Sequence, residues 1–263
     1  MNELTIEDIH LRLLFIAKCF DEICRKNNIP YYMLGGTMLG AIRHKGFIPW
    51  DDDMDFGVES KYYDKLLKLL EKELPPYITI KTIENSELIF NTPSKIEDNR
   101  TIIKEPSRAN IKEDLGINID IFPLYRTNGN TSFFSRNNMV HILALINSYR
   151  FGNIHIMKGW RKISALLLRI SFYPFSKLDI THFIHQYLIP NGGSYLSNLY
   201  GFWGVKEIIH NEIIGNPTLY KFENIYLYGV ENYDKYLCSL YGDYMKVPPI
   251  EKRHIHIANV YTK

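Results

Sequence analysis

Cysteine is scarce in this chain of 263 residues. Its three cysteines, Cys19, Cys24 and Cys238, form no CxxC pair and no even set. This excludes a disulfide framework and a cysteine-based zinc site, and it fits a reducing compartment. Long apolar runs are also missing, and none approaches the ~20 residues of a membrane-spanning helix. The N-terminal MNELTIEDIHLRLLF has acids before its apolar residues, so we expect no secretory signal and a cytoplasmic protein.

The remaining composition is that of a folded globular protein. Apolar residues make up 46% of the chain and charged residues 23%, which argues against extended disorder. The length allows one large domain, or a core with a smaller lobe. There is no internal repeat and no low-complexity linker. The net charge of +2 carries little information, because the distribution of charge determines the partners.

Acidic residues are absent from residues 126–178, which contain eight Lys or Arg side chains. The segments FFSRNNMVHILALINSYRF and WRKISALLLRISFYPF predict two helices with basic and apolar faces. We therefore divide the chain into a core at 1–125, a basic helical region at 126–190 and a return to the core domain at 191–263. No nucleic-acid-binding motif accompanies the basic charge, so we expect no nucleic-acid partner.

The first half of the chain predicts helices and strands around a pair of glycines. Apolar residues at spacings of three and four predict a helix over 5–28, with Thr5 as its N-cap. A strand at 31–34 then leads through Gly35 and Gly36 into a short helix. Residues 53–58 alternate between polar and apolar, as expected of a strand with one wet face. The further predicted elements are a helix at 60–73 and strands at 77–83, 87–91 and 117–122.

Three aspartates project from the polar faces of two predicted strands. Asp53 and Asp55 lie about 6.6 Å apart along an extended chain and point the same way. If the strand that carries Asp120 pairs beside them, a third carboxylate reaches the same place. Three carboxylates suit one or two Mg²⁺ ions, or Mn²⁺, which can hold both oxygens of a phosphoryl displacement. Asp120 is also the candidate general base. The alternative is a solvated turn or a helix cap.

The glycine pair supplies a complementary anion site. Gly35 and Gly36 let the backbone approach a phosphate, and a helix beginning near Thr37 would direct free N–H groups at it. Arg43 and Lys45, one helix length further on, could neutralise the remaining phosphate charge. The order of glycine pair, Asp-x-Asp strand and distant Asp strand predicts metal-dependent phosphoryl or nucleotidyl transfer.

Four ordered blocks resemble the LicD family, which also includes the eukaryotic fukutin-type proteins. They are GGTMLGAIRHKGFIPWDDDMDFGV (35–58), SKIEDNRTIIKE (94–105), GINIDIFPL (116–124) and LYGDYMKVPPIEKRHIH (240–256). The resemblance implies an α/β nucleotidyltransferase-type fold (mixed α+β), with a small mixed β-sheet flanked by helices. It also implies a phosphotransferase. LicD-like enzymes transfer phosphocholine from CDP-choline to a sugar hydroxyl of a cell-surface glycan, fukutin-type members transfer ribitol phosphate from CDP-ribitol, and CMP leaves.

The resemblance assigns roles by motif position. The phosphate turn corresponds to Gly35, Gly36 and Thr37, the metal-binding pair to Asp53 and Asp55, and the third acid to Asp120.

Five further residues fall inside the blocks. Asp51 could be an acceptor or a metal-water ligand, and Trp50 could stack on a base or simply pack. Lys95 is a candidate phosphate ligand, with a surface role as the alternative. Arg253 and His254 could reach the donor.

These observations predict a cytoplasmic Mg²⁺-dependent transferase of phosphocholine from CDP-choline to a glycan such as teichoic acid, capsule or lipopolysaccharide. CDP-ribitol or CDP-glycerol as donor, a true nucleotidyltransferase, and an inactive binding module are the alternatives. The abundant aromatic residues, 19 Tyr, 14 Phe and 3 Trp, could hold choline by cation–π contacts but do not decide against a polyol. The basic region could rest on anionic lipid at the inner face of the plasma membrane, near a lipid-linked acceptor. Its charges could instead be solvated or matched by acids elsewhere.

Overall fold

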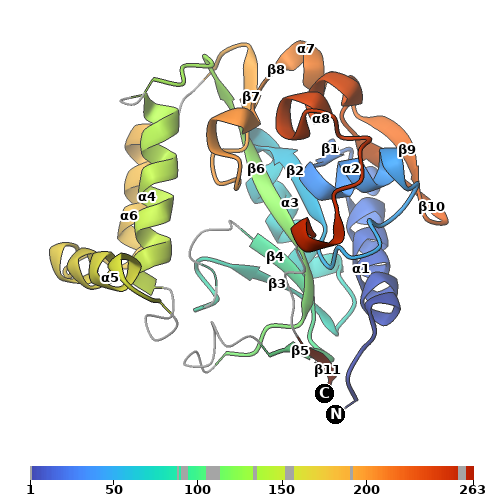
Figure 1. Ribbon diagram of the computed structural model, residues 1–263, viewed down its shortest axis with the longest axis horizontal. Helices are drawn as coiled ribbons and strands as arrows, with labels where there is room; N and C mark the ends of the chain where they lie inside the picture. Colours follow the sequence, from blue (N-terminus) through green and yellow to red (C-terminus); the bar gives the residue numbers. More distant parts are fainter. Residues whose placement is uncertain are drawn as a thin grey trace.

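One mixed sheet forms the centre of the computed structural model, which describes residues 2–87, 89, 94–104, 113–132, 135–151, 157–189, 192–253 and 259–263 (Figure 1). Its strands are β1 (Tyr31–Met33), β2 (Asp55–Glu59), β3 (Ile78–Thr82), β4 (Ser94–Asp98), β6 (Ile117–Thr127), β7 (Tyr195–Ser197), β8 (Ile208–His210), β9 (Thr218–Phe222) and β10 (Ile225–Gly229). The order is β3-β4-β6-β2-β1-β10-β9, with β7 and β8 continuing from β6. The expected mixed sheet is confirmed, and with nine strands it is larger than the small sheet expected.

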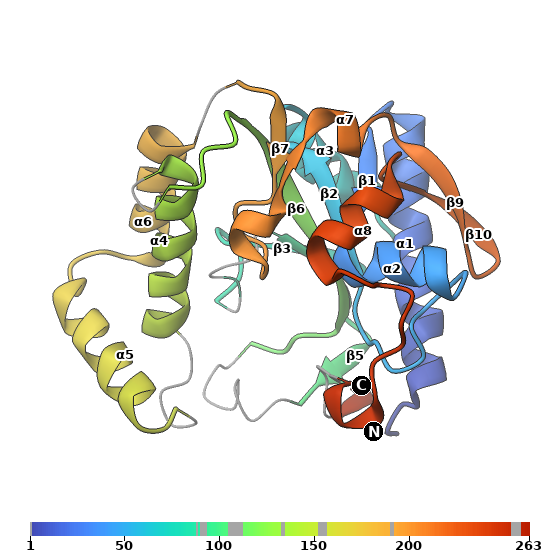
Figure 2. The same cartoon turned by 45° about the horizontal axis from the view of Figure 1, so that its top comes forward.

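Helices flank this sheet as expected. They are α1 (Ile6–Lys26), α2 (Gly35–Arg43), α3 (Ser60–Glu73), α4 (Arg136–Phe151), α5 (Trp160–Ser171), α6 (Lys177–Phe183), α7 (Asn211–Ile214) and α8 (Tyr233–Tyr241). Short η segments follow at Ile184–Leu188, Gly204–Glu207 and Ile250–Lys252. Helices α1 and α3 pack on one face of the sheet, while α4, α5 and α6 stand beside it as a separate layer (Figures 1 and 2). A second small sheet pairs β5 (Thr101–Ile103) with β11 (Val260–Thr262).

The predicted N-terminal helix is confirmed, and its start follows from local chemistry. The Thr5 hydroxyl accepts a hydrogen bond from the Asp8 N–H, and the Asp8 carboxylate accepts one from the Thr5 N–H. This reciprocal pair satisfies two N–H groups that the first turn leaves open. The apolar stripe of α1 is buried against the sheet, where the Phe20 ring packs 4.9 Å from Tyr31 of β1 and 5.0 Å from Phe56 of β2, between ring centroids.

Two boundaries near the glycine pair differ from the sequence-based expectation. Helix α2 begins at Gly35, so the glycines form its first turn and not a separate bend before it. Strand β2 begins at Asp55 and not at Asp53. The Asp55 N–H donates to the Thr37 hydroxyl (2.8 Å), and the Met54 carbonyl accepts from the Asp120 N–H (2.8 Å). The Asp55 N–H is thus taken up by a side chain, and Met54 bonds to β6 through its carbonyl. Asp53 lies in the loop before the strand.

The remaining predicted elements are mostly found. Helix α3 and strands β3 and β6 lie where the patterns indicated, and the basic segment forms α4 and α5. The expected strand at 87–91 falls largely on residues outside the described part of the chain. The division at residues 126 and 191 stays a prediction, while β6 runs on to Thr127 and pairs with β7. Among the described residues, no helix has the length and apolar character needed to cross a membrane.

Candidate active site

Four charged residues form a row across the sheet. Lys81 of β3 lies opposite Lys95 of β4, Lys95 lies opposite Asp120 of β6, and Asp120 lies opposite Asp55 of β2. Direct cross-strand partners project from the same face of a sheet. The row therefore places Asp55 and Asp120 side by side, on the face opposite to the one that buries Ile119 and Ile121.

Lys95 supplies positive charge to these acids. Its ammonium forms an ion pair with the Asp120 carboxylate and donates to the Asn118 side-chain oxygen at 3.1 Å. Burial raises the pKa of Asp55 well above its usual range, the charges of Asp53 and Asp120 raise it further, and Lys95 opposes them. A cluster of carboxylates that disfavours its own ionisation is stabilised by a cation. Lys95 already provides one such cation.

The donor set fits a hard divalent ion chemically, although the side chains are not drawn together around one. In the described part of the chain, no group of three or more His, Cys, Asp or Glu side chains is placed to hold a metal ion. Asp53, Asp55 and Asp120 nevertheless all face one cavity and offer only the oxygen ligands that Mg²⁺ prefers. An ion bound by Asp120 would compete with Lys95 for its carboxylate. Their roles as metal ligands stay a prediction.

The acidic loop before β2 lies against the first turn of α2. The Asp51 carboxylate is so close to Gly36 that a Cβ at this glycine would lie 2.8 Å from an Asp51 oxygen. Burial, together with the neighbouring charges of Asp53 and Asp52, raises the pKa of Asp51 to about 8. The Asp52 side chain is buried and is not among the residues that line the cavity.

The N terminus of α2 opens toward the acids. Gly35 has a φ of +46°, which a glycine adopts without strain. Its N–H donates to the Tyr236 hydroxyl at 3.0 Å, and no side chain caps the helix. A Cβ at Gly35 would lie 3.6 Å from both an Asp55 oxygen and the Tyr241 hydroxyl. The positive end of a helix is thereby held next to a carboxylate, which is a suitable place for a metal-bound anion.

A cavity of about 1070 Å³ collects these groups. One wall carries the acids, the first turn of α2 and Arg43, and another is formed by α4. The lining residues from these walls include Gly35, Gly36, Arg43, Trp50, Asp51, Asp53, Asp55, Asp120, His141 and Ala144. The size suits a nucleotide-sized ligand, because ligand pockets usually measure ~300 to 1,000 Å³.

Several predicted residues do not line this cavity. Thr37 is buried, and its hydroxyl orients the β2 backbone at Asp55 instead of facing a ligand. Lys45 is exposed with a left-handed φ of 60° and lies outside the cavity lining, so its contact with a phosphate stays a prediction. Lys45 has this position because α2 ends at Arg43, and the turn after it directs Lys45 away. His254 lies outside the described residues.

Arg43 and Arg253 are held at the edge of the site. One Arg43 guanidinium nitrogen donates to the Tyr244 carbonyl at 2.8 Å, and burial lowers the pKa of Arg43. The Arg253 guanidinium lies 4.1 Å above the Trp50 ring centroid and donates to the Pro248 carbonyl. The structure therefore joins two of the predicted residues, Trp50 and Arg253, in one cation–π contact.

An aromatic end of the cavity was not predicted. Trp203 and Tyr241 meet edge to face at 5.3 Å between ring centroids, and both line the cavity with Glu207. The Glu207 carboxylate accepts hydrogen bonds from the Trp203 backbone N–H at 2.8 Å and from the Asn198 side-chain amide at 2.7 Å. Burial raises the pKa of Glu207 to about 7, against the lowering effect of these two hydrogen bonds. No motif marks these residues: Trp203 and Glu207 lie in the connection between β7 and β8, and Tyr241 ends α8.

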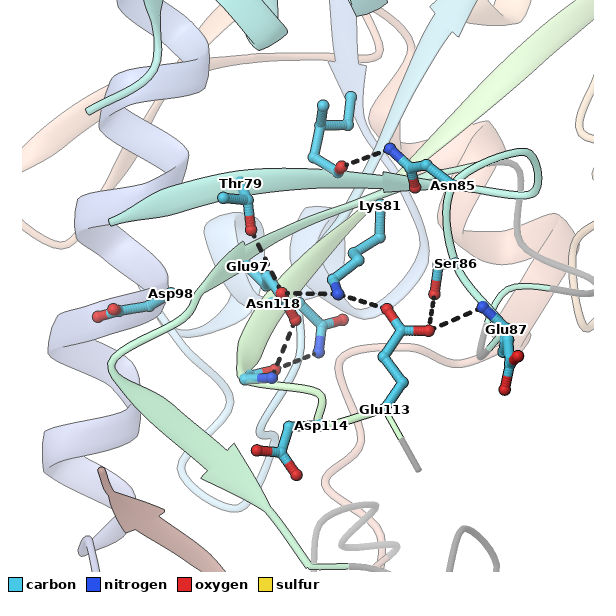
Figure 3. Close-up of polar contacts among 12 residues, drawn as sticks. Thr79, Lys81, Asn85, Ser86, Glu87, Glu97, Asp98, Glu113, Asp114 and Asn118 are labelled. Atoms are coloured by element: carbon cyan, nitrogen blue, oxygen red, sulfur yellow. Dashed lines mark hydrogen bonds and ion pairs between the residues drawn. The ribbon is translucent and has the colours of Figure 1, made fainter. Parts of the chain in front are cut away.

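A second polar network supports the far end of the charged row (Figure 3). Lys81 bridges Glu97 at 3.4 Å and Glu113, and together these acids raise its pKa although burial lowers it. Glu113 also accepts hydrogen bonds from the Ser86 hydroxyl (2.9 Å) and the Glu87 N–H (2.7 Å). The network fixes β3, β4 and the loop after β3 next to Lys95.

The sequence around this site is similar to known proteins. Residues 28–142 match the family model described as the LicD/FKTN/FKRP nucleotidyltransferase domain. The chain is 29% identical, over 97% of both chains, to the lipopolysaccharide cholinephosphotransferase LicD of Haemophilus influenzae. It is 26% identical over 108 residues to the mouse ribitol 5-phosphate transferase FKRP, covering 38% of this chain and 18% of that protein. An uncharacterized protein of Rickettsia prowazekii is 50% identical over 48 residues, 18% of each chain.

Residues 28–142 are thus similar to a nucleotidyltransferase domain. The matched stretch contains the glycine pair and all three predicted acids. The resemblance to the LicD family seen in the sequence blocks is confirmed by this match and by the similarity over nearly the whole chain. Both named relatives are phosphotransferases, so the expectation of an enzyme of that class is confirmed as well.

Proposed function

We propose that the chain transfers phosphocholine from CDP-choline to a sugar hydroxyl of a bacterial cell-surface glycan, with Mg²⁺ at the acids. The observation that carries the proposal is the register of Asp55 and Asp120 on neighbouring strands beside the uncapped N terminus of α2. An anion site next to paired carboxylates suits a metal-bound diphosphate. The similarity to a cholinephosphotransferase over nearly the whole chain supports choline as the transferred alcohol.

The residues of the cavity would divide the reaction between them. Asp53, Asp55 and Asp120 would hold the divalent ion, which supplies positive charge to the diphosphate oxygens when bound. The N–H groups of the first α2 turn and Arg43 would bind and orient the phosphates.

Proton transfer completes the proposed reaction. The acceptor hydroxyl oxygen forms a bond to the phosphorus that carries choline, the bond from this phosphorus to the CMP oxygen breaks, and the hydroxyl proton passes to Asp120. CMP leaves as the anion. Lys95, paired with Asp120, would move to a phosphate oxygen as the carboxylate accepts its new partners.

The aromatic end of the cavity favours a cationic alcohol. Trp203 and Tyr241 offer ring faces, and Glu207 brings a carboxylate to the same end. A quaternary ammonium over such rings gains roughly 0.5 to 2 kcal/mol per contact. A polyol such as ribitol or glycerol would gain less from these rings. The Asn198 amide nitrogen already donates to Glu207, so it is not free to bind a polyol hydroxyl. CDP-ribitol and CDP-glycerol remain the alternative donors, and nucleotidyl transfer is the alternative reaction.

Donor binding and product analysis test this function. The purified chain is titrated calorimetrically with CDP-choline, CDP-ribitol, CDP-glycerol and CDP, each with and without Mg²⁺. We expect CDP-choline to bind tighter than CDP and the other two, and only with Mg²⁺. Incubation with glycan should then release CMP and add the mass of phosphocholine to the acceptor. Gain of a nucleotide by the acceptor, or equal affinity for all CDP compounds, would contradict the proposal.

A further inference from the structure

Helix α5 turns its apolar side away from the protein. Trp160, Ile163 and Ile170 are 67%, 61% and 72% exposed, and Leu166 and Leu167 are exposed between them. Because positions three, four and seven apart share a face of a helix, these five side chains form one continuous stripe, named here the α5 stripe. In both views α5 lies at the outer edge of the helical layer (Figures 1 and 2).

The opposite side of α5 is the one packed on α4. Ala165 is its only buried residue, and Ser164 and Leu168 are half-buried. An ordinary amphipathic helix buries its large apolar residues and exposes its polar ones. In α5 the small residue Ala165 is packed instead. None of the residues that the structure describes covers the large apolar side chains of the α5 stripe. Such a surface indicates a binding partner.

Basic side chains flank the α5 stripe. Lys158, Arg161 and Lys162 are exposed at the start of the helix, and residues 126–178 contain no acid. At least three of the other five basic residues of this segment have partners in the protein. Arg126 pairs with Glu59, Arg150 donates to the carbonyls of Phe172 and Phe175, and Lys177 donates to those of Ser86 and Ile89. Lys158, Arg161 and Lys162 thus place three exposed positive charges beside the α5 stripe.

We infer that α5 docks on the surface of an anionic lipid bilayer. The α5 stripe would enter the boundary between headgroups and acyl chains, and Lys158, Arg161 and Lys162 would contact anionic headgroups, as in other interfacial helices. A second copy of the chain fits less well, because a symmetric contact through this face would bring like charges together without an acid from the same segment.

Docking through α5 would leave one helix, α4, between the membrane-bound surface and the cavity. Helix α5 packs on α4, and α4 lines the cavity through His141, Ala144 and Ser148. Membrane binding through α5 thus deepens the proposed function, on which this step rests, by assigning the acceptor to lipid-linked glycans. The binding itself is independent of the reaction.

Vesicle sedimentation of the full chain tests the docking. Large vesicles of phosphatidylcholine alone are compared with vesicles that also contain phosphatidylglycerol, without donor or acceptor. We expect binding to the anionic vesicles, a blue shift of Trp160 emission that is lost in Trp160→Phe, and weaker binding at high salt. The double variant Ile163→Glu/Ile170→Glu should lower the partition coefficient about tenfold or more. Leu219→Glu, at a 46% exposed site on β9, is the matched control and should bind normally.

Three outcomes would overturn the inference. They are equal binding to neutral and anionic vesicles, unchanged binding by the double variant, and a wild-type dimer in light scattering that the double variant converts to a monomer. Activity separates this test from the reaction. The double variant should keep wild-type turnover of a soluble acceptor and lose it selectively when the acceptor is anchored in vesicles. If wild-type protein binds vesicles but transfers nothing, the proposed reaction is wrong and the docking stands.

Discussion

Asp55 and Asp120 are direct partners in the parallel register of β2 and β6. They come from segments 65 positions apart in sequence, and the sheet brings both to one wall of the cavity. Each would otherwise be an ordinary polar residue on an alternating strand. Their adjacency beside the first turn of α2 gives the site its capacity to hold a cation and a diphosphate together.

Removing either carboxylate should abolish transfer without unfolding the protein. For Asp55→Asn and Asp120→Asn we expect turnover to fall about 10²- to 10³-fold or more, because each removes charge stabilisation that the reacting diphosphate requires. Asp64→Asn, at an exposed position of α3, is the matched control. Circular dichroism checks folding, and CMP release measures turnover. Wild-type turnover by Asp55→Asn would refute its role.

A divalent ion should stabilise the folded chain through the same acids. If Mg²⁺ binds the native state at this site, it should raise the melting temperature by an amount that grows with the logarithm of its concentration above Kd. We expect the rise in the wild type and in Asp64→Asn, and its loss in Asp53→Asn and Asp55→Asn. Differential scanning calorimetry with Mg²⁺, Mn²⁺ and chelator measures it without any donor. An equal rise in all four proteins would place the ion elsewhere.

Glu207 should make the folded state less stable as pH rises. Its folded-state pKa of about 7 lies above the ordinary value of 4.5. Below pH 4.5 the carboxyl is protonated in both states and costs nothing. Between pH 4.5 and 7 only the unfolded state ionises, so stability falls, and above pH 7 the loss is complete at about 3 kcal/mol.

The variant Glu207→Gln isolates this effect. The glutamine amide changes the hydrogen bonds that residue 207 makes, but the free-energy cost of this change does not depend on pH. The difference in unfolding free energy between wild type and variant should therefore shift in favour of the variant from pH 4.5 to pH 8. Urea unfolding at both pH values measures the shift. A difference that is the same at both would show that Glu207 titrates normally.

Trp203 should discriminate between donors. Trp203→Leu is expected to raise the KM for CDP-choline about three- to thirtyfold, because one cation–π contact is lost, and to leave the affinity for CDP unchanged. Tyr226→Leu, at an exposed site on β10, serves as the control. If the same substitution weakens CDP and CDP-choline equally, Trp203 contacts the nucleotide and not the alcohol.

Local chemistry explains which elements the sequence could predict. The capping pair of Thr5 and Asp8 and the regular apolar spacing specify α1, and the alternation around Asp120 specifies β6, because both signals lie within a few residues. The alternation pattern predicts a strand that begins at Asp53, two residues before the start of β2 in the structure, because Asp53 continues the alternation. Only the tertiary contact between Thr37 and the Asp55 N–H shows where the strand begins.

Long-range contacts explain what the sequence could not predict. The pattern marked Asp120 and Lys95 separately, but their ion pair depends on the register of β4 and β6. Glu207 and Trp203 follow no recognisable motif, and they reach the cavity through a short connection after β7. The distance of Lys45 from Gly35 along a continuous helix predicts a contact with phosphate, but α2 ends at Arg43, before it reaches Lys45.

The mass added to the acceptor glycan tests most directly whether the chain transfers phosphocholine. Wild-type protein, Asp120→Asn and Asp64→Asn are incubated with CDP-choline, Mg²⁺ and lipid-linked glycan, and the glycan is analysed by mass spectrometry. We predict that wild type and Asp64→Asn add one phosphocholine to the glycan for each CMP released, and that Asp120→Asn adds none. Phosphocholine transfer by Asp120→Asn at the wild-type rate, or addition of a cytidine nucleotide in place of phosphocholine, would contradict this function.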